Sequence, residues 1–347
     1  VGSEMCIRDR YPVGKPKFWK GNYIPDEVHN KYWFIRIRTR FKLKPGKLPT
    51  VQIKNSFLYM GNEYLETSDV WDSEKEKYVS ELLMPDGTIA DTRITMTMTC
   101  IDYILFREQY YVYDFEILDG CWFFCQSGIF DEYIEKYKKI KIESKEGMRT
   151  IAKLFLNNLY GKEAASTDSS FKIAYEKPDG VIGFIPVKEN DKLPGYIPCG
   201  SAITSYSRNF TIRAAQANYY GVDKPGFIYA DTDSIHCDIQ AEQVKNIEIH
   251  DTDFCKWKLE SYWDEAIFTR QKTYIEHVTH EDGKLVKPYY NVRCAGMPQK
   301  SKDLFVKELG GMYTLEDFDI GLKLRGKLTP KRIVGGTVLI ETTYEMR

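Results

Sequence analysis

The sequence lacks an excess of positive charge, a long apolar run and a paired-cysteine motif, and each absence narrows the class of protein. Its 49 Lys and Arg residues against 50 Asp and Glu give a net charge of −1, so binding to nucleic acid would require basic residues gathered on one surface. No apolar run approaches the ~18 residues of a membrane-spanning helix, and no signal peptide is apparent. The eight cysteines include no C-x-x-C, which indicates reduced thiols and a cytoplasmic protein.

What is present is a globular composition with many aromatic side chains. The chain has 347 residues, 43% hydrophobic and 29% charged, enough for two or three subdomains with a sizeable core. It contains 25 Tyr, whose rings suit base stacking as well as ordinary interfaces. There are no internal repeats and no low-complexity stretch. Strands and helices alternate without a strict βαβ order, which favours an α+β fold.

The most informative motif is Tyr-Ala-Asp-Thr-Asp-Ser at residues 229–234. It places Asp231 and Asp233 in an apolar run after Gly226, a pattern typical of a strand or a tight strand–turn–strand. Two carboxylates on one face of a strand repel each other unless a cation lies between them, and Mg²⁺ takes such oxygen ligands. A two-metal phosphoryl- or nucleotidyl-transfer site needs this arrangement. The alternative is a simple turn or a helix N-cap cluster.

A second motif is an amphipathic helix over residues 149–161. Its polar stripe consists of Arg149, Lys153, Asn157 and Tyr160. Its apolar side is expected to consist of Ile151, Leu154, Phe155 and Leu159. Two cations, an amide and a phenol on one stripe, with Lys141 upstream, could grip a nucleoside triphosphate. The alternative is a surface helix whose Lys and Arg side chains snorkel into solvent.

Three weaker patterns accompany these motifs. In residues 35–44, five basic residues alternate with apolar ones, which indicates either a solvated edge strand or a phosphate-facing surface; we favour the latter. Lys272 and Tyr274 are two apart in an expected strand, where they could hold a nucleic-acid backbone, and Thr204 and Arg208 form a similar pair on a helix. His277 and the acidic residues around it are interpreted as a solvated loop rather than a metal cluster.

The expected elements follow from periodicity and turn signals. Helices are predicted over residues 75–84, 101–108, 131–160 (a pair interrupted near 144–147), 200–220 and 253–268. Strands are predicted within 11–60 and over 110–129, 226–238 and 270–279. Hairpins are predicted within 164–198, turning at Pro178-Asp179-Gly180, and around Gly335-Gly336 beside a short helix in 303–347.

Taken together, the motifs resemble those of family B DNA polymerases, in the protein-primed branch that replicates small bacteriophages with linear genomes. Lys153-Leu-Phe-Leu-Asn-Asn-Leu-Tyr-Gly161 is similar to motif B, Tyr229-Ala-Asp-Thr-Asp-Ser234 to motif C, and Lys272-Thr-Tyr274 to the K-x-Y motif. Flanking segments agree: Gly61-Asn-Glu-Tyr-Leu65, Cys294-Ala-Gly-Met297 and Val334-Gly-Gly-Thr-Val338. The resemblance runs from about Tyr11 to Arg347.

The resemblance implies a role for each matching residue. Asp233 would be the chief ligand of two Mg²⁺ ions and Asp231 a weaker one, and Lys153 would complete the catalytic set. Incoming deoxynucleoside triphosphates would bind Lys141, Arg149, Lys153, Asn157 and Tyr160. The DNA primer–template would contact Thr204, Arg208, Lys272 and Tyr274.

The resemblance also implies a right-hand polymerase with an antiparallel palm sheet, truncated at its N-terminus. Its expected parts are a non-native leader (1–10), partial palm with a first terminal-protein-region insertion (11–130), fingers (131–165), a second such insertion (166–195), palm with motif C and K-x-Y (196–305) and thumb (306–347). We expect a monomer that acts with a terminal-protein primer in the cytoplasm, that of the host cell if the protein is viral, and away from membranes.

Two parts of the family's pattern are missing. Motif A, an aspartate followed by Ser-Leu-Tyr-Pro, is absent: the residue five positions before Tyr11 is Cys6, and Asp9 is at the wrong spacing. The exonuclease domain is absent as well, and Asn158 stands where motif B usually has Ser. The sequence therefore predicts a DNA-directed DNA polymerase, a nucleotidyltransferase of viral DNA replication, and as the alternative a catalytically inactive DNA-binding fragment.

Overall fold

The computed structural model describes residues 10–53, 58–59, 64–178, 182–188, 193–250 and 256–347. The chain forms two compact units, described separately: residues 1–235 with 244–246 and 252–256, and residues 236–243, 247–251 and 257–347. The expected leader up to Asp9, the Asp179-Gly180 turn and Gly61–Glu63 lie outside the described residues. No helix of the described ranges is both long enough and apolar enough to cross a bilayer.

The described residues of the first unit form four α-helices, one 3-10 helix (η2) and a series of antiparallel strands. Its elements are β1 (Tyr11–Lys20), η2 (Asp26–Val28), β2 (Tyr32–Leu43), β3 (Val70–Asp72), β4 (Lys77–Val79), β5 (Glu81–Leu83), β6 (Ile89–Asp91), β7 (Ile94–Thr99), α1 (Cys100–Gln109), β8 (Tyr110–Gln126), α2 (Asp131–Glu143), α3 (Glu146–Glu163), β9 (Asp168–Glu176), β10 (Ile182–Lys188), α4 (Ile197–Ala217) and β11 (Phe227–Asp231).

The second unit is mainly β-structure. Its elements are η3 (Ala241–Gln243), β13 (Ser261–Arg270), β14 (Thr273–Glu281), β15 (Lys284–Cys294), α5 (Gln299–Lys307), η4 (Leu315–Asp317), β16 (Lys323–Ile333) and β17 (Gly336–Glu345). The remaining strand, β12 (Ser234–Cys237), pairs with β11 and contains the boundary between the units. The mixed order of helices and antiparallel strands confirms the predicted α+β class.

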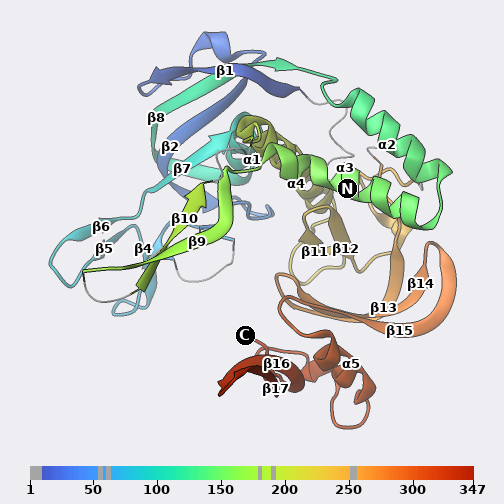
Figure 1. Ribbon diagram of the computed structural model, residues 1–347. Coiled ribbons are helices and arrows are strands. Elements are labelled where there is room, and N and C mark those ends of the chain that lie inside the picture. Colours follow the sequence, from blue (N-terminus) through green and yellow to red (C-terminus); the bar gives the residue numbers. More distant parts are fainter. Residues whose placement is uncertain (1–9, 54–57, 60–63, 179–181, 189–192, 251–255) are drawn as a thin grey trace. The chain divides into compact units, whose positions relative to one another are not determined.

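The main sheet of the first unit has the strand order β1-β8-β2-β7, visible in blue and teal in Figure 1. Strand β2 is internal, paired antiparallel with β8 on one side and β7 on the other. Its apolar residues Ile35, Ile37 and Phe41 are at most 1% exposed, as the alternation predicted. They form the main core with Trp19 and Trp122 of the neighbouring strands.

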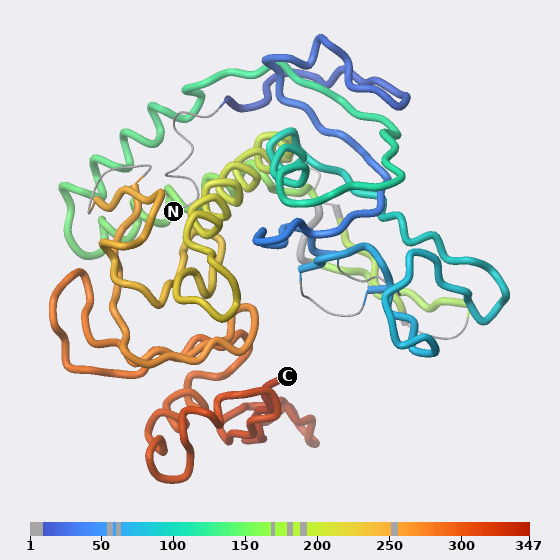
Figure 2. Tube along the Cα trace, turned by 180° about the vertical axis from the view of Figure 1, so that it is seen from behind, coloured from blue at the N-terminus to red at the C-terminus, as the bar shows by residue number. Residues whose placement is uncertain are grey.

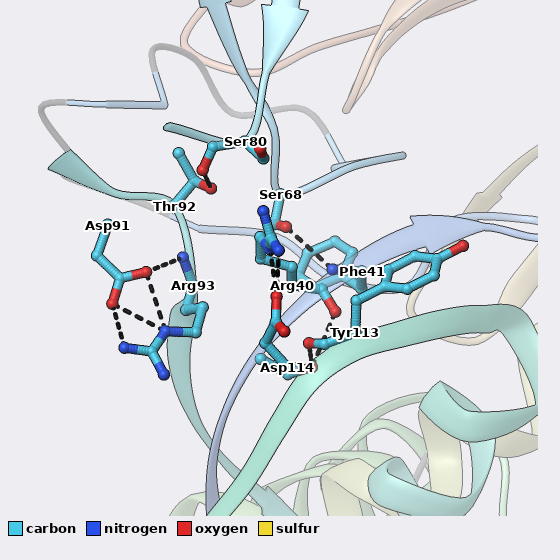
Figure 3. A network of polar contacts seen from close by, with 10 residues as sticks. Arg40, Phe41, Ser68, Ser80, Asp91, Thr92, Arg93, Tyr113 and Asp114 are labelled. Carbon is cyan, nitrogen blue, oxygen red and sulfur yellow. Dashed lines mark hydrogen bonds and ion pairs between the residues drawn. The ribbon is translucent and has the colours of Figure 1, made fainter. Parts of the chain in front are cut away.

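The basic residues of β2 are balanced within the sheet itself. Three of them pair with carboxylates of β8: Arg36 with Asp119, Arg38 with Glu116 and Arg40 with Asp114. Figure 3 shows the last of these pairs, with Arg93 forked onto Asp91 nearby. Cross-strand carboxylates thus supply the counter-charge of three of the five basic residues in this row. The expectation that the row faces phosphate stays a prediction.

Two predicted helices are strands. Residues 75–84 contribute to the hairpins β3–β4 and β5–β6, and the Asp72 carboxylate fixes the first turn by accepting from the backbone N–H groups of Glu74 and Lys75 at 3.0 and 3.2 Å. In the second unit, 261–270 forms β13 along β14. Its aromatic and β-branched side chains favour a strand once a partner is present, and this outweighs a short helical period.

Helix α1 begins at a capping Thr99 and packs beside α4, as Figure 2 shows in teal and olive. A half-buried carboxylate, that of Asp102, joins the two helices. Asp102 accepts two hydrogen bonds from the Arg208 guanidinium, at 3.0 and 2.9 Å, and bonds from the hydroxyls of Ser205 at 2.7 Å and Thr99 at 3.1 Å. Burial alone would raise the pKa of Asp102, but these donors and the Arg208 charge hold it below its ordinary value.

Helices α2 and α3 form an antiparallel pair, as predicted for 131–160. Ile134 and Leu156 are fully buried between them. The Tyr137 and Phe155 rings stack with centroids 4.7 Å apart, and the Tyr133 hydroxyl donates to the Phe155 carbonyl at 2.9 Å. Aromatic stacking of this kind fixes the pairing of the two helices.

The second unit has its own core between the sheet β13-β14-β15, α5 and the hairpin β16–β17. Ile275, Phe305, Phe318 and Leu324 are at most 1% exposed. The short helix and the terminal hairpin match the sequence-based prediction for the tail, and the hairpin turns at Val334-Gly335, directly before Gly336 of β17.

Gly120 lies where the main sheet has no room for a side chain. A Cβ there would lie 2.2 Å from ring atoms of Trp19 and 2.5 Å from the Phe34 carbonyl oxygen. We expect Gly120→Ala to lower the free energy of unfolding by about 2 kcal/mol or more. Gly147→Ala, in open space on α3, is the control and should leave stability unchanged or raise it by up to about 1 kcal/mol. Equal urea midpoints for the two variants would contradict this packing.

The Asp102 network makes stability depend on pH. The pKa of Asp102 is lower in the folded chain than its unfolded value of about 3.9. The ionised carboxylate therefore stabilises the folded chain fully above about pH 4, and this contribution is lost as the pH falls through the folded-state pKa. We expect Asp102→Asn to cost about 2–3 kcal/mol at pH 7 and progressively less below pH 4. Urea unfolding of the unsubstituted chain and of the Asp102→Asn variant across this pH range measures the cost. A difference in unfolding free energy that does not change with pH would exclude the ionised network.

Candidate functional site

The two predicted carboxylates lie at a tight turn between β11 and β12. Asp231 is the last residue of β11, Asp233 lies in the turn, and β12 begins at Ser234. Of the two arrangements that the sequence allowed, strand or strand–turn–strand, the second is found. Both side chains are half-buried.

Side-chain hydrogen bonds hold this turn in a strained backbone conformation. Thr232 has a φ of +47°, which is unfavourable for a β-branched residue and persists only where the surroundings impose it. The Thr211 hydroxyl of α4 donates to the Thr232 carbonyl at 2.9 Å, and the Ser234 hydroxyl donates to the Asp231 carbonyl at 3.1 Å. The turn is therefore anchored to α4.

The donor set of the turn fits a hard cation. Mg²⁺ is commonly held by one or two carboxylates while water and substrate phosphates fill its other positions. The Asp231 carboxylate accepts a hydrogen bond from the Thr232 hydroxyl at 3.0 Å, which orients one of its oxygens. Within the ranges that the structure describes, three or more His, Cys, Asp or Glu side chains nowhere gather into one metal-binding group.

Helix α3 exposes the predicted polar stripe but buries a different apolar one. Arg149, Lys153, Asn157 and Tyr160 are all exposed, and the buried residues are Ala152, Leu156 and Leu159. Of the expected apolar side, only Leu159 is buried. Ile151, Leu154 and Phe155 are 44–53% exposed. The helix packs on α2 along a narrow seam, so hydrophobicity alone did not identify the face that it buries.

Lys141 belongs to the last turn of α2, not to α3, and is half-buried. The α2–α3 pair therefore carries all five predicted nucleotide-binding residues, four of them on one helix.

Thr204 and Arg208 lie one turn apart on α4, as predicted. The Thr204 hydroxyl donates to the Ser201 carbonyl at 2.9 Å. Arg208 is held by Asp102 through Nε and Nη2, and its side chain is 42% exposed. A guanidinium has five N–H donors, so this pairing fixes its orientation and still leaves donors for a phosphate.

Lys272 and Tyr274 do not share a strand face, which corrects the sequence-based prediction. Arg270 pairs with Thr273 across a two-residue turn, so Lys272 lies in the turn, with a φ of +56°. Tyr274 lies on β14 and stacks on Phe268 with centroids 5.2 Å apart. The turn, rather than a strand face, presents the lysine.

The loop expected around His277 is also wrong, because the segment belongs to β14. His277 pairs with Asp264 at 2.7 Å, and Glu276 is buried and contacts His236. The sequence contained one signal for the contact between Glu276 and His236. Tyr274 and Glu276 are two residues apart, which places them on one face of a strand.

Comparison with known proteins agrees with the motifs. The sequence profile of the family described as DNA polymerase type B, organellar and viral, matches residues 5–253. The DNA polymerase of Bacillus phage phi29 is 35% identical over 349 residues, covering 97% of this chain and 54% of the relative. The DNA polymerase of Streptococcus phage Cp-1 is 33% identical over 351 residues, covering 98% of this chain and 54% of the relative.

Solved structures give the same result. Phi29 DNA polymerase complexed with primer-template DNA and incoming nucleotide substrates matches this chain with a TM-score of 0.76 and 33% sequence identity. The same polymerase complexed with primer-template DNA matches with a TM-score of 0.74 and 34% sequence identity. Each match covers 100% of this chain and 56% of the other. The chain thus spans about half the length of the relatives it matches, and it belongs to the type B DNA polymerases of organelles and viruses.

Proposed function

We propose that this chain supplies the polymerising half of a protein that adds deoxynucleotides to a primer 3′-hydroxyl, or to the hydroxyl of a terminal protein, under the direction of a DNA template. The observation that carries the proposal is the strained Asp231–Asp233 turn anchored to α4, in a chain whose relatives are phage DNA polymerases. The relative solved with primer-template DNA and incoming nucleotides supports these as the ligands.

Asp231 and Asp233 would hold the divalent cations of the reaction, with Asp233 as the chief ligand. When bound, two Mg²⁺ ions would neutralise charge on the phosphates and on the attacking and leaving oxygens. The turn contributes by fixing both carboxylates before substrate binds, because Thr211 and Ser234 hold its backbone carbonyls. A preformed turn avoids reorganisation during the reaction.

The exposed stripe of α3 would bind the incoming nucleotide. Lys153 and Arg149 would contact its phosphates with Lys141 assisting, while Asn157 and Tyr160 would contact the sugar and the nascent base pair. Cations one helical turn apart suit a chain of phosphates, and a phenol suits a sugar or base. The phosphate contacts would orient the nucleotide for in-line attack.

The remaining predicted residues would hold the DNA. Thr204 and Arg208 would contact the primer–template backbone, with Arg208 kept in one orientation by Asp102. Lys272 in its turn and Tyr274 on β14 would stabilise the primer terminus. In this assignment residues 131–165 are the fingers, 196–305 the main part of the palm and 306–347 the thumb, while 11–130 and 166–195 contain the two terminal-protein-region insertions.

Replacing the chief carboxylate separates chemistry from binding. We expect Asp233→Ala to lower the rate of nucleotide addition in a primer-extension assay at least about a hundredfold, because a ligand of the catalytic cation is lost. Affinity for primer–template, measured by fluorescence anisotropy, should change less than about twofold. The control is Asp223→Ala, an exposed aspartate ahead of β11. Undiminished synthesis by the Asp233 variant would overturn the assignment.

Replacing the helix lysine tests the nucleotide site. We expect Lys153→Ala to raise the apparent KM for deoxynucleotide about tenfold, which corresponds to one lost charge-assisted contact. Lys162→Ala provides the control, since it lies nine residues further along the same helix, on the opposite face, and is also exposed. An unchanged KM in the Lys153 variant, or an equal change in both, would exclude the assigned role.

A further inference from the structure

Tyr274 belongs to a cluster of three rings in the second unit. Its ring stacks on Phe268 at 5.2 Å with an interplanar angle of 27°, and it meets the edge of the His236 ring at 5.1 Å and 61°. His236 also contacts Phe268 edge-on at 5.3 Å. The position of the imidazole therefore restricts where the phenol ring can lie.

A buried carboxylate sets the position of that imidazole. Glu276 is 2% exposed, and its Oε1 lies 2.7 Å from His236 Nδ1. This distance is that of a hydrogen bond, so the carboxylate holds the imidazole in place. The second oxygen of Glu276 accepts from the Asn291 amide at 3.1 Å. Both oxygens are thus satisfied, as a buried carboxylate requires.

The register of the sheet explains how this network reaches Tyr274. Tyr274 and Glu276 are two apart on β14, so their side chains share one face. Asn291 lies directly opposite Glu276 on β15. A row of polar contacts therefore runs from β15 across β14 to His236 and ends at the phenol ring.

We propose that His236, Glu276 and Asn291 are positioning residues that hold Tyr274 against the primer terminus. This rests on the proposed function, which assigns Tyr274 to the primer terminus. A network of this kind acts by preventing rotation of the ring, so its loss should weaken binding at the recessed 3′ end and spare contacts elsewhere along the duplex.

The test compares two DNA ligands on the full 347-residue chain by anisotropy competition: a primer–template with a recessed 3′ end, and a duplex of the same length that is closed by hairpin loops and has no 3′ terminus. We expect Glu276→Gln to weaken binding of the recessed end about five- to tenfold. Affinity for the closed duplex should remain that of the unsubstituted chain.

The sheet provides a matched control. His277 and Asp264 form a second histidine–carboxylate pair at 2.7 Å, on the other face of β14, where His277 contacts Tyr290 and not Tyr274. Asp264→Asn should leave both affinities unchanged. The double variant His236→Phe with Glu276→Leu keeps a ring beside Tyr274 and leaves no buried charge unpaired, so it should fold. It should still lose the preference for the recessed end.

The outcomes distinguish the two proposals. An unsubstituted chain that does not prefer the recessed end overturns the proposed function, and this inference with it. A preference that survives in Glu276→Gln or in the double variant overturns the positioning role alone. Equal weakening of both ligands also overturns it, because it indicates general loss of structure. Loss confined to the recessed end, with Asp264→Asn unaffected, supports it.

Discussion

The half-buried Asp102 carboxylate ties helix α4 to α1, and four candidate residues of the first unit depend on α4: Thr204, Arg208, Asp231 and Asp233. Asp102 binds Arg208 directly, and Thr211 on the same helix anchors the strained turn that carries Asp231 and Asp233. A shift of α4 would therefore move a proposed DNA contact and both carboxylates together. Four hydrogen bonds to one half-buried carboxylate make this a cooperative unit, in which loss of one partner weakens the others.

The sequence predicted those features that depend only on residues close together in the chain. The alternation of Ile35, Ile37 and Phe41 predicted the buried face of β2, and the Asp-Thr-Asp motif predicted a turn or strand with paired carboxylates. The period of α3 predicted its polar stripe. Each of these signals lies within one element, where side-chain direction follows from backbone geometry.

Features that depend on distant partners were not predicted. Three residues of the basic row pair with Asp114, Glu116 and Asp119, some 80 positions along the chain. Spacing within one strand contains no information about these partners. The helix expected at 253–268 is largely a strand because β14 pairs with it. The seam that α3 buries is set by α2, and the burial of Glu276 depends on His236 and Asn291. Tertiary contacts outweighed local preference in each case.

The proposed polymerase function requires that the template select the nucleotide, and one binding measurement tests this without requiring turnover. A primer–template with a dideoxy-terminated primer is titrated with the chain in the presence of Mg²⁺ and each of the four deoxynucleoside triphosphates in turn. We expect only the nucleotide complementary to the first unpaired template base to tighten binding of the DNA. Equal affinities with all four nucleotides would contradict it.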